Sequence, residues 1–423
     1  TGVQNVIIGG LAGDALTVGT RNVALGTGAL TADTQGSMST ALGHYALAAQ
    51  NFTSATNVYN VAVGHNAGAA VTTGGLNTLV GALSGDALTI GNSNVTLGYL
   101  ALSRDTEGDR STAIGFQTLA NQNFTSNTDT YNTAVGYNAG VAVTTGTVNT
   151  LVGGLAGDAL TSGNSNVALG YLALSADTLG DRAVAIGMNA LASQNFTSST
   201  DSYNVGIGYQ AGYLVTTGVQ NTIIGGLAGD SLTSGGSNVA VGYNALSTED
   251  GHGSNTAIGA SALATQNAGA NAYNVAVGAS AGQSITTGIQ NTLIGGLAGD
   301  ALQDADYNIA IGVNALGADT LGSASVAIGR AALEAQNFAS ATTTYNTAVG
   351  YLAGNGVTTG VQNTLIGGLA GDALQDADRN VAIGYEALTS DDLGSRTVAI
   401  GVGAAGQQNY ASATDSHNVC IGD

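Results

Sequence analysis

The feature that most constrains this chain is an internal repeat that fills all 423 residues. A unit that opens with Thr-Gly-Val-Gln-Asn-Val-Ile-Ile-Gly-Gly-Leu-Ala-Gly-Asp-Ala-Leu returns five more times with few changes. The six copies span residues 1–72, 73–144, 145–216, 217–286, 287–358 and 359–423, and the last is truncated. Because no linker or change of composition separates them, we expect one continuous solenoid in which each unit stacks on its neighbours.

A shorter segment of five residues recurs four times in each copy, which gives 24 segments. One example runs from Asn166 to Gly170 and reads Asn-Val-Ala-Leu-Gly. Across the chain the first position is Asn in 19 segments, and the fifth is always Gly. The second position is Val, Thr or Ile, and the fourth is Val, Ile or Leu.

This pattern predicts an all-β fold, a parallel β-solenoid of about 24 coils. Aliphatic or β-branched residues two apart lie on one face of a strand, and the Gly that follows permits a corner with positive φ. We expect a second short strand after each corner, for example at 171–174, and then a polar turn. Each Asn is expected to form a side-chain ladder with the Asn of the next coil.

The strand pattern also predicts which residues are buried. Positions two and four are predicted to form the core: Val167, Leu169, Val184, Ile186, Ile207, Ile224, Val241 and Ile258. The corner glycines are expected to have positive φ, or a neighbouring backbone too close for a Cβ: Gly153, Gly170, Gly187 and Gly208.

The third strand position is mostly Ala, so the strands are apolar on both faces. Strands of this kind are usually covered on both faces, which favours packing of the second face against sister chains around an axis. The predicted contacts between chains are Ala168, Ala185, Ala240 and Cys420. The alternative is a thin single solenoid that leaves these alanines exposed.

The segments Asn166–Gly170 and Asn274–Gly278 match the pattern N-[VT]-A-[VIL]-G. This pattern resembles the YadA-like head repeats of trimeric autotransporter adhesins, and the stretch Asn132–Gly140 is similar to the shafts of some bacteriophage tail fibres. The resemblance implies a left-handed parallel β-roll that packs as a homotrimer outside the cell. The coils of 17 and 21 residues are longer than those typical of the adhesin heads.

Composition excludes several classes of function. The net charge of −20 repels phosphate backbones, so nucleic acid is not an expected partner. No run of 18 apolar residues exists, and we predict no membrane insertion by this segment. The four histidines stand in no fixed relation to Ser and Asp, so we predict neither catalysis nor a cofactor.

Four kinds of residue offer less favoured binding sites: histidines, aromatic residues, acidic turn residues and the Asn of sequons. His44 and His65 follow the Gly of neighbouring strands and could hold a metal, but later copies place bulky side chains there, so no metal site is predicted. Those bulky residues include the expected ladder Tyr99, Phe116 and Tyr137, which is interpreted as structural, with stacking on sugar rings as the alternative.

Acidic residues in the turns are the next candidates. Asp105, Glu107 and Asp109 cluster in one turn, and we expect solvated carboxylates there rather than a calcium site. The long coils carry Asn-x-Thr sequons, and glycosylation is the less favoured hypothesis for them: Asn51, Asn123 and Asn195.

These observations favour an extracellular structural fibre or filament at a cell or virion surface. The fibre would be adhesin-like, and its repeated loops would bind a host-surface glycan or a protein receptor through many weak contacts. The alternatives are the shaft of a bacteriophage tail fibre and a purely structural filament without a ligand. Because both ends of the chain fall inside a repeat, it is expected to be a segment of a longer protein.

Overall fold

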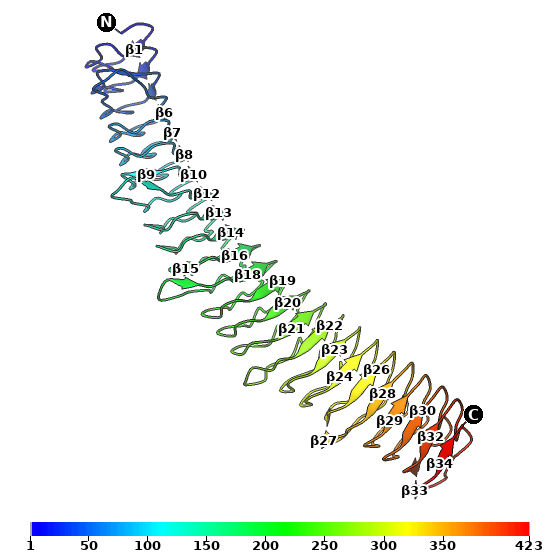
Figure 1. The fold of residues 1–423 in the computed structure, drawn as a ribbon. Helices are drawn as coiled ribbons and strands as arrows, with labels where there is room; N and C mark the ends of the chain where they lie inside the picture. Colours follow the sequence, from blue (N-terminus) through cyan, green and yellow to red (C-terminus); the bar gives the residue numbers. More distant parts are fainter. Residues whose placement is uncertain (1, 423) are drawn as a thin grey trace. The chain divides into compact units, whose positions relative to one another are not determined.

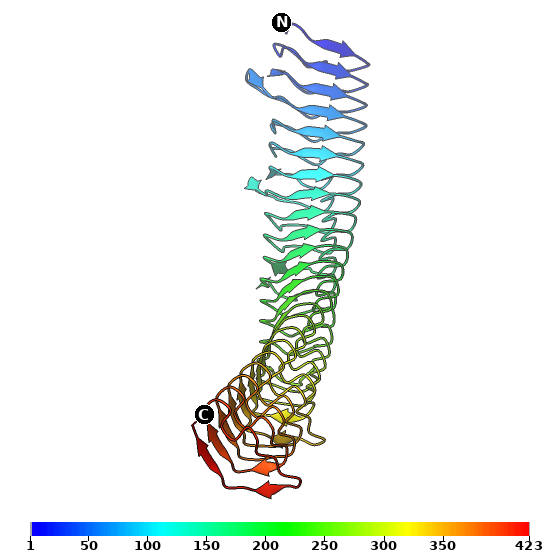
Figure 2. The same ribbon diagram turned by 90° about the vertical axis from the view of Figure 1, so that its right-hand side faces the viewer.

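The computed structural model describes residues 2–422 and confirms an all-β parallel solenoid of about 24 turns (Figures 1 and 2). That part of the chain contains no helix. The structure divides into two units, residues 2–210 and 211–422. Thr1 and Asp423, the outer bounds of the first and last predicted repeats, lie outside the described residues.

The first unit stacks one three-residue strand per turn, and neighbouring strands pair in parallel and in register. Its main-sheet strands are β1 (Val6–Ile8), β2 (Val23–Leu25), β4 (Thr40–Leu42), β6 (Val61–Val63), β7 (Thr78–Val80), β8 (Val95–Leu97), β10 (Thr112–Ile114), β12 (Thr133–Val135), β13 (Thr150–Val152), β14 (Val167–Leu169), β16 (Val184–Ile186) and β18 (Val205–Ile207). Three two-stranded sheets join the loops: β3 (Gly36–Ser37) with β5 (Thr56–Asn57), β9 (Gly108–Asp109) with β11 (Thr128–Asp129), and β15 (Gly180–Asp181) with β17 (Thr200–Asp201).

The second unit has the same design. Its main-sheet strands are β19 (Thr222–Ile224), β20 (Val239–Val241), β21 (Thr256–Ile258), β22 (Val275–Val277), β23 (Thr292–Ile294), β24 (Ile309–Ile311), β26 (Val326–Ile328), β28 (Thr347–Val349), β29 (Thr364–Ile366), β30 (Val381–Ile383), β32 (Val398–Ile400) and β34 (Val419–Ile421). Its two-stranded sheets are β25 (Gly322–Ser323) with β27 (Thr342–Thr343), and β31 (Gly394–Ser395) with β33 (Thr414–Asp415). Residues 217–286, the fourth copy, contain no sheet of this second kind.

The middle residue of each strand faces the interior of its own coil. Ala168, Ala185 and Ala240 are each 0% exposed in the single chain, so their predicted contacts with sister chains are wrong. Cys420 pairs in register with the buried Ala399 and lies on the same side of the sheet. Cys420 itself is half-buried in the last described strand, so its predicted contact between chains stays a prediction.

The residues predicted to form the core lie on the outer face instead. Leu169 and Ile258 are 36% and 38% exposed. The others are half-buried: Val167, Val184, Ile186, Ile207, Ile224 and Val241. The prediction therefore assigned the two faces of the sheet the wrong way round.

The reason lies in how little room each coil encloses. Ala173 and Leu174, from the segment after the corner, fill the interior together with the strand alanines, and both are fully buried. Where the strand carries the larger Leu151, the chain places Gly157 beside it, and a Cβ on Gly157 would lie 2.8 Å from Leu151 Cδ2. Large and small side chains therefore alternate between these two positions: Leu174 lies with Ala168, and Leu151 lies with Gly157.

The segment after the corner is not a second strand, contrary to the sequence-based prediction. Residues 171–174 form successive turns, in which Leu172 and Leu174 have φ of 55° and 54°. This left-handed conformation is unfavourable for Leu. Burial of the Leu174 side chain opposes that cost.

The corner glycines behave as predicted. Gly153, Gly170, Gly187 and Gly208 have φ of 137°, 138°, 129° and 135°. A Cβ on Gly170 would lie 2.5 Å from the carbonyl oxygen of Gly187 in the next coil. Both the conformation and the close approach of the coils require Gly here.

The interior assignment predicts opposite tolerances for adjacent residues. Ala185→Leu should lower the free energy of unfolding by about 1–3 kcal/mol, because it overpacks a filled interior. Ile186→Thr on the outer face should cost no more than about 1 kcal/mol. Thermal and denaturant unfolding of both variants checks this, and equal losses would contradict the assignment.

The corner geometry gives a second prediction. Gly170→Ala should destabilise the protein by at least about 1–3 kcal/mol, the cost of the backbone conformation alone. Gly154→Ala is the matched control, because its Cβ would lie 3.5 Å from the ring of Tyr171 in ordinary contact. Denaturant titration measures both, and a Gly170→Ala variant as stable as the control would refute the explanation.

Candidate functional site

The Asn at the start of each strand fixes one coil on the next. Asn166 Oδ1 accepts a hydrogen bond of 2.8 Å from the backbone N–H of Ala183, and its Nδ2 donates to the carbonyl of Gly180 at 2.8 Å. Asn149 Oδ1 accepts from the backbone N–H of Asn166 in the same way. The ladder therefore runs from side chain to backbone, rather than between Asn side chains as we expected.

The longer coils contain a buried acid and amide network. Asp177 Oδ1 accepts from the backbone N–H groups of Gly180 and Phe196 at 3.0 and 3.4 Å. Its Oδ2 accepts from Gln194 Nε2 at 2.6 Å. Gln194 Oε1 in turn accepts from Asn204 Nδ2 at 2.8 Å. Asp177, Gln194 and Asn204 are each 0% exposed.

The same acid and amide pair recurs in four other copies. The pairs are Asp33 with Gln50, Asp105 with Gln122, Asp319 with Gln336, and Asp391 with Gln408. Asp105 and Asp109 were predicted to be solvated, and this is wrong because they are only 0% and 7% exposed. The signal that could have found the network is Asp-x-x-Gly with a Gln 17 residues after the Asp.

Burial raises the pKa of Asp177 and of Asp319 above the ordinary value. The hydrogen bonds from Gln194 and Gln336 act in the opposite direction, because they favour the ionised carboxylate. The Gln amides therefore offset part of the free-energy cost of burying these carboxylates inside the coil. We interpret the role of this network as structural, because Asp177, Gln194 and Asn204 are fully buried.

The outer face of the main sheet is the larger candidate for function. None of the 24 strands carries a charged residue at position two or four. Val95 and Leu97 of β8 are 39% and 48% exposed. Position four is aliphatic in all 24 strands, whereas position two is Thr in ten of them. The outer face of each unit is therefore an uncharged strip with a continuous aliphatic row at position four. Exposed strips of this kind usually mark surfaces that contact another molecule.

Aromatic residues extend this strip at the position after several of the corner glycines. The predicted ladder is confirmed: the ring centroids of Tyr99 and Phe116 lie 5.6 Å apart, and those of Phe116 and Tyr137 lie 5.4 Å apart. All three side chains are more than 40% exposed. The rings of His44 and His65 stack in the same way, 5.2 Å apart and nearly parallel.

A different edge of the first unit presents a repeated charged group. Arg110 forms an ion pair with Asp129 and lies over the ring of Tyr131, 5.7 Å from its centroid. Arg182 repeats this arrangement with Asp201 and Tyr203. In Figure 1 the neighbouring strands β9 and β15 lie apart from the main sheet. The sequon residues are also exposed: Asn51, Asn123 and Asn195.

Comparison with known proteins gives no relative for this chain. No protein-family model matches the sequence, and no curated protein matches it either. Within residues 2–422, no helix has the length and apolar character that a membrane crossing needs.

The buried network predicts a loss of stability that depends on pH. Gln194→Leu removes the amide from Asp177 and should cost about 1–3 kcal/mol at neutral pH. It should also raise the pKa of Asp177 further. A carboxyl group whose pKa is raised in the folded state adds stability that is present at acid pH and lost as pH rises through that pKa. The penalty should therefore be largest near pH 7 and smaller below the ordinary Asp pKa.

Unfolding curves of both proteins from acid to neutral pH measure this. Gln35→Leu is the control, because the Gln35 amide donates to the Thr53 carbonyl at the surface. It should cost little at any pH. A penalty for Gln194→Leu that does not change with pH would contradict the explanation.

Proposed function

We propose that this chain is a segment of an extracellular structural fibre, in which copies of the solenoid pack along their outer apolar faces as a homotrimer. The fibre presents the same loop surface many times and acts like an adhesin. The observation that supports this proposal is the uncharged outer face of the main sheet, with its uninterrupted row of partly exposed aliphatic residues at position four in each unit.

Charge supports a second copy of the chain as the occupant of this face. Each chain carries a net charge of −20, so two copies repel one another over most of their surfaces. The outer face has no charge at positions two and four of any strand. Contact there buries apolar area without bringing like charges together. Parallel strands at every turn also give both copies the same spacing along the interface.

The resemblance to adhesin head repeats favours three chains, a left-handed roll and a location at the cell surface. Absence of Lys leaves few cleavage sites for trypsin-like proteases, which suits a location outside the cell. A tail-fibre shaft at a virion surface is the second candidate, since it uses the same packed solenoid. The third candidate is a filament that binds nothing.

We assign attachment to a receptor to the edge of the first unit that carries Arg110 and Arg182, because the proposed trimer covers the outer face of the main sheet. The groups around Arg110 and Arg182 are exposed and identical, so weak contacts to a glycan or a protein receptor add up to avidity. Binding of the trimer to immobilised glycans and host-cell proteins tests this. Loss of binding by an Arg110→Ala/Arg182→Ala variant that stays trimeric supports attachment at this edge. If wild type binds neither surface, the adhesin interpretation is wrong.

The proposal predicts the mass of the particle in solution. Wild type should sediment as a trimer. The variant Leu169→Glu/Ile186→Glu/Ile207→Glu puts three charges on the outer face of three successive turns and should shift the protein toward monomer. Analytical ultracentrifugation, with circular dichroism to verify folding, measures both.

The control carries the same added charge on the loops: Thr53→Glu/Thr125→Glu/Thr197→Glu, at exposed positions. It should remain a trimer. A monomeric wild type at all concentrations, or equal dissociation of both variants, would refute packing through the outer face.

A further inference from the structure

The fourth copy, residues 217–286, departs from the other copies at one turn. Glu249 stands where the third copy has the buried Asp177, 72 residues earlier. His252 stands where the third copy has Gly180, and Asn255 stands where it has Ala183. This turn also lacks the short two-stranded sheet found in the other five copies.

These changes deprive the acid of its amide partner. Gln266 Nε2, the equivalent of Gln194, donates to Asn255 Oδ1 at 3.1 Å instead of to a carboxylate. Glu249 is 0% exposed, yet its Oε2 is buried without a hydrogen-bond partner. Asn255 Nδ2 is buried without a partner as well. A buried carboxylate with one oxygen left without a donor is unfavourable unless another group supplies positive charge.

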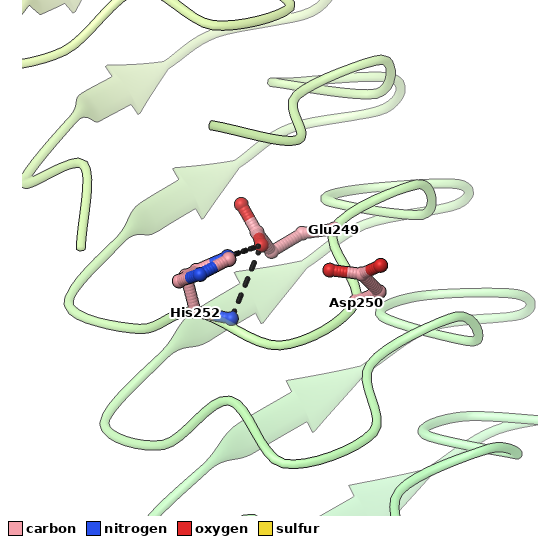
Figure 3. A group of neighbouring side chains, drawn as sticks. All are labelled: Glu249, Asp250 and His252. Atoms are coloured by element: carbon pink, nitrogen blue, oxygen red, sulfur yellow. Dashed lines mark hydrogen bonds and ion pairs between the residues drawn. The ribbon is translucent and has the colours of Figure 1, made fainter. Parts of the chain in front are cut away.

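Two further ligand groups gather beside this carboxylate (Figure 3). His252 Nδ1 lies 3.3 Å from Glu249 Oε1, and the backbone N–H of His252 donates to the same oxygen at 3.2 Å. Asp250 is the neighbouring residue and is exposed. One ligand atom from each of Glu249, Asp250 and His252 lies within 4.8 Å of the other two.

We propose that Glu249, Asp250 and His252 bind a first-row divalent transition metal of the Zn²⁺ type. One imidazole nitrogen with two carboxylates is a ligand set that Zn²⁺ accepts, and water from the exposed side completes the coordination. The carboxylate of Glu249 can bind the ion through either oxygen, because rotation about its last bond exchanges them, and the charge of the ion compensates the buried carboxylate as a whole. The hard cations Ca²⁺ and Mg²⁺ prefer sites made only of oxygen.

The electrostatics of the turn agree with a cation. Glu249 is fully buried, and its Oε2 has no hydrogen-bond donor among residues 2–422. A bound ion supplies the compensation that Gln194 gives Asp177. The ion would also join the two ends of a turn that lacks the short sheet, and so stabilise this coil of the second unit.

Zinc binding to the full chain tests the proposal. Titration with ZnCl₂ in excess Mg²⁺, followed by isothermal calorimetry, should show one site per chain. His252→Ala should weaken it by about tenfold or more. Glu249→Asp restores the residue of the other copies but draws the carboxylate back by one methylene, and should also weaken binding. X-ray absorption of the wild-type zinc complex should show an imidazole ligand with oxygen neighbours.

The matched control is His44→Ala/His65→Ala, which removes the two stacked histidines of the first unit and leaves His252 in place. This variant should bind zinc as wild type does. Circular dichroism verifies that each variant is folded, and the absorption spectrum of wild type does not depend on any variant. Three results would overturn the proposal: no zinc bound by wild type in excess Mg²⁺, a spectrum without an imidazole ligand, or affinity lost in the control but kept in folded His252→Ala.

Discussion

Hydrogen bonding from each coil to the next is the interaction on which the rest of the structure depends. A strand of three residues cannot hold its register alone, since a slip of one residue exchanges its two faces. The Asn at the start of the strand prevents this. As Asn166 shows, its side chain binds the first backbone N–H of the next strand and a carbonyl of the next turn. Both partners are buried, so losing the Asn would leave unpaired groups inside the coil.

The longer coils show what happens where this ladder is interrupted. Position one is Ser, Ala or Thr in the strand before a long coil in five copies: Ser39, Ser111, Ala183, Ser325 and Thr397. The small side chain makes room for a Gln from the long coil, which reaches in and binds both the buried Asp and the next Asn. In the fourth copy Asn255 keeps the Asn and draws Gln266 away from Glu249. Glu249 Oε2 therefore has no hydrogen-bond partner at that turn, because Gln266 binds the Asn of the ladder instead.

The narrow interior determines where the apolar surface goes. Each coil encloses space for an Ala from the strand and an Ala-Leu pair from the turn segment, as at Ala168, Ala173 and Leu174. The Val, Leu, Ile and Thr at positions two and four lie on the outer face. A Leu or Ile at position three enters the interior only where a Gly leaves room for it, as Gly157 does for Leu151. A small interior therefore produces a large apolar exterior. Packing of copies through that exterior, as proposed above, would complete the burial that one chain cannot achieve alone.

The sequence by itself determined the parallel ladder and the corners, because a fixed period with Gly at one phase is compatible only with stacked coils. It also located the aromatic stack at Tyr99 and Phe116, since residues at the same phase of the repeat must lie one above the other. Only the tertiary structure decided which face of each strand is inside. Strands such as Val167–Leu169 are apolar on both faces, so an alternation of apolar and polar residues does not indicate which face is buried. The volume that the turn segments leave inside the coil decides which face of the strand points inward. For the same reason the sequence placed Asp105 in a solvated turn: its burial depends on Gln122, which only the stacked coils bring within 2.6 Å.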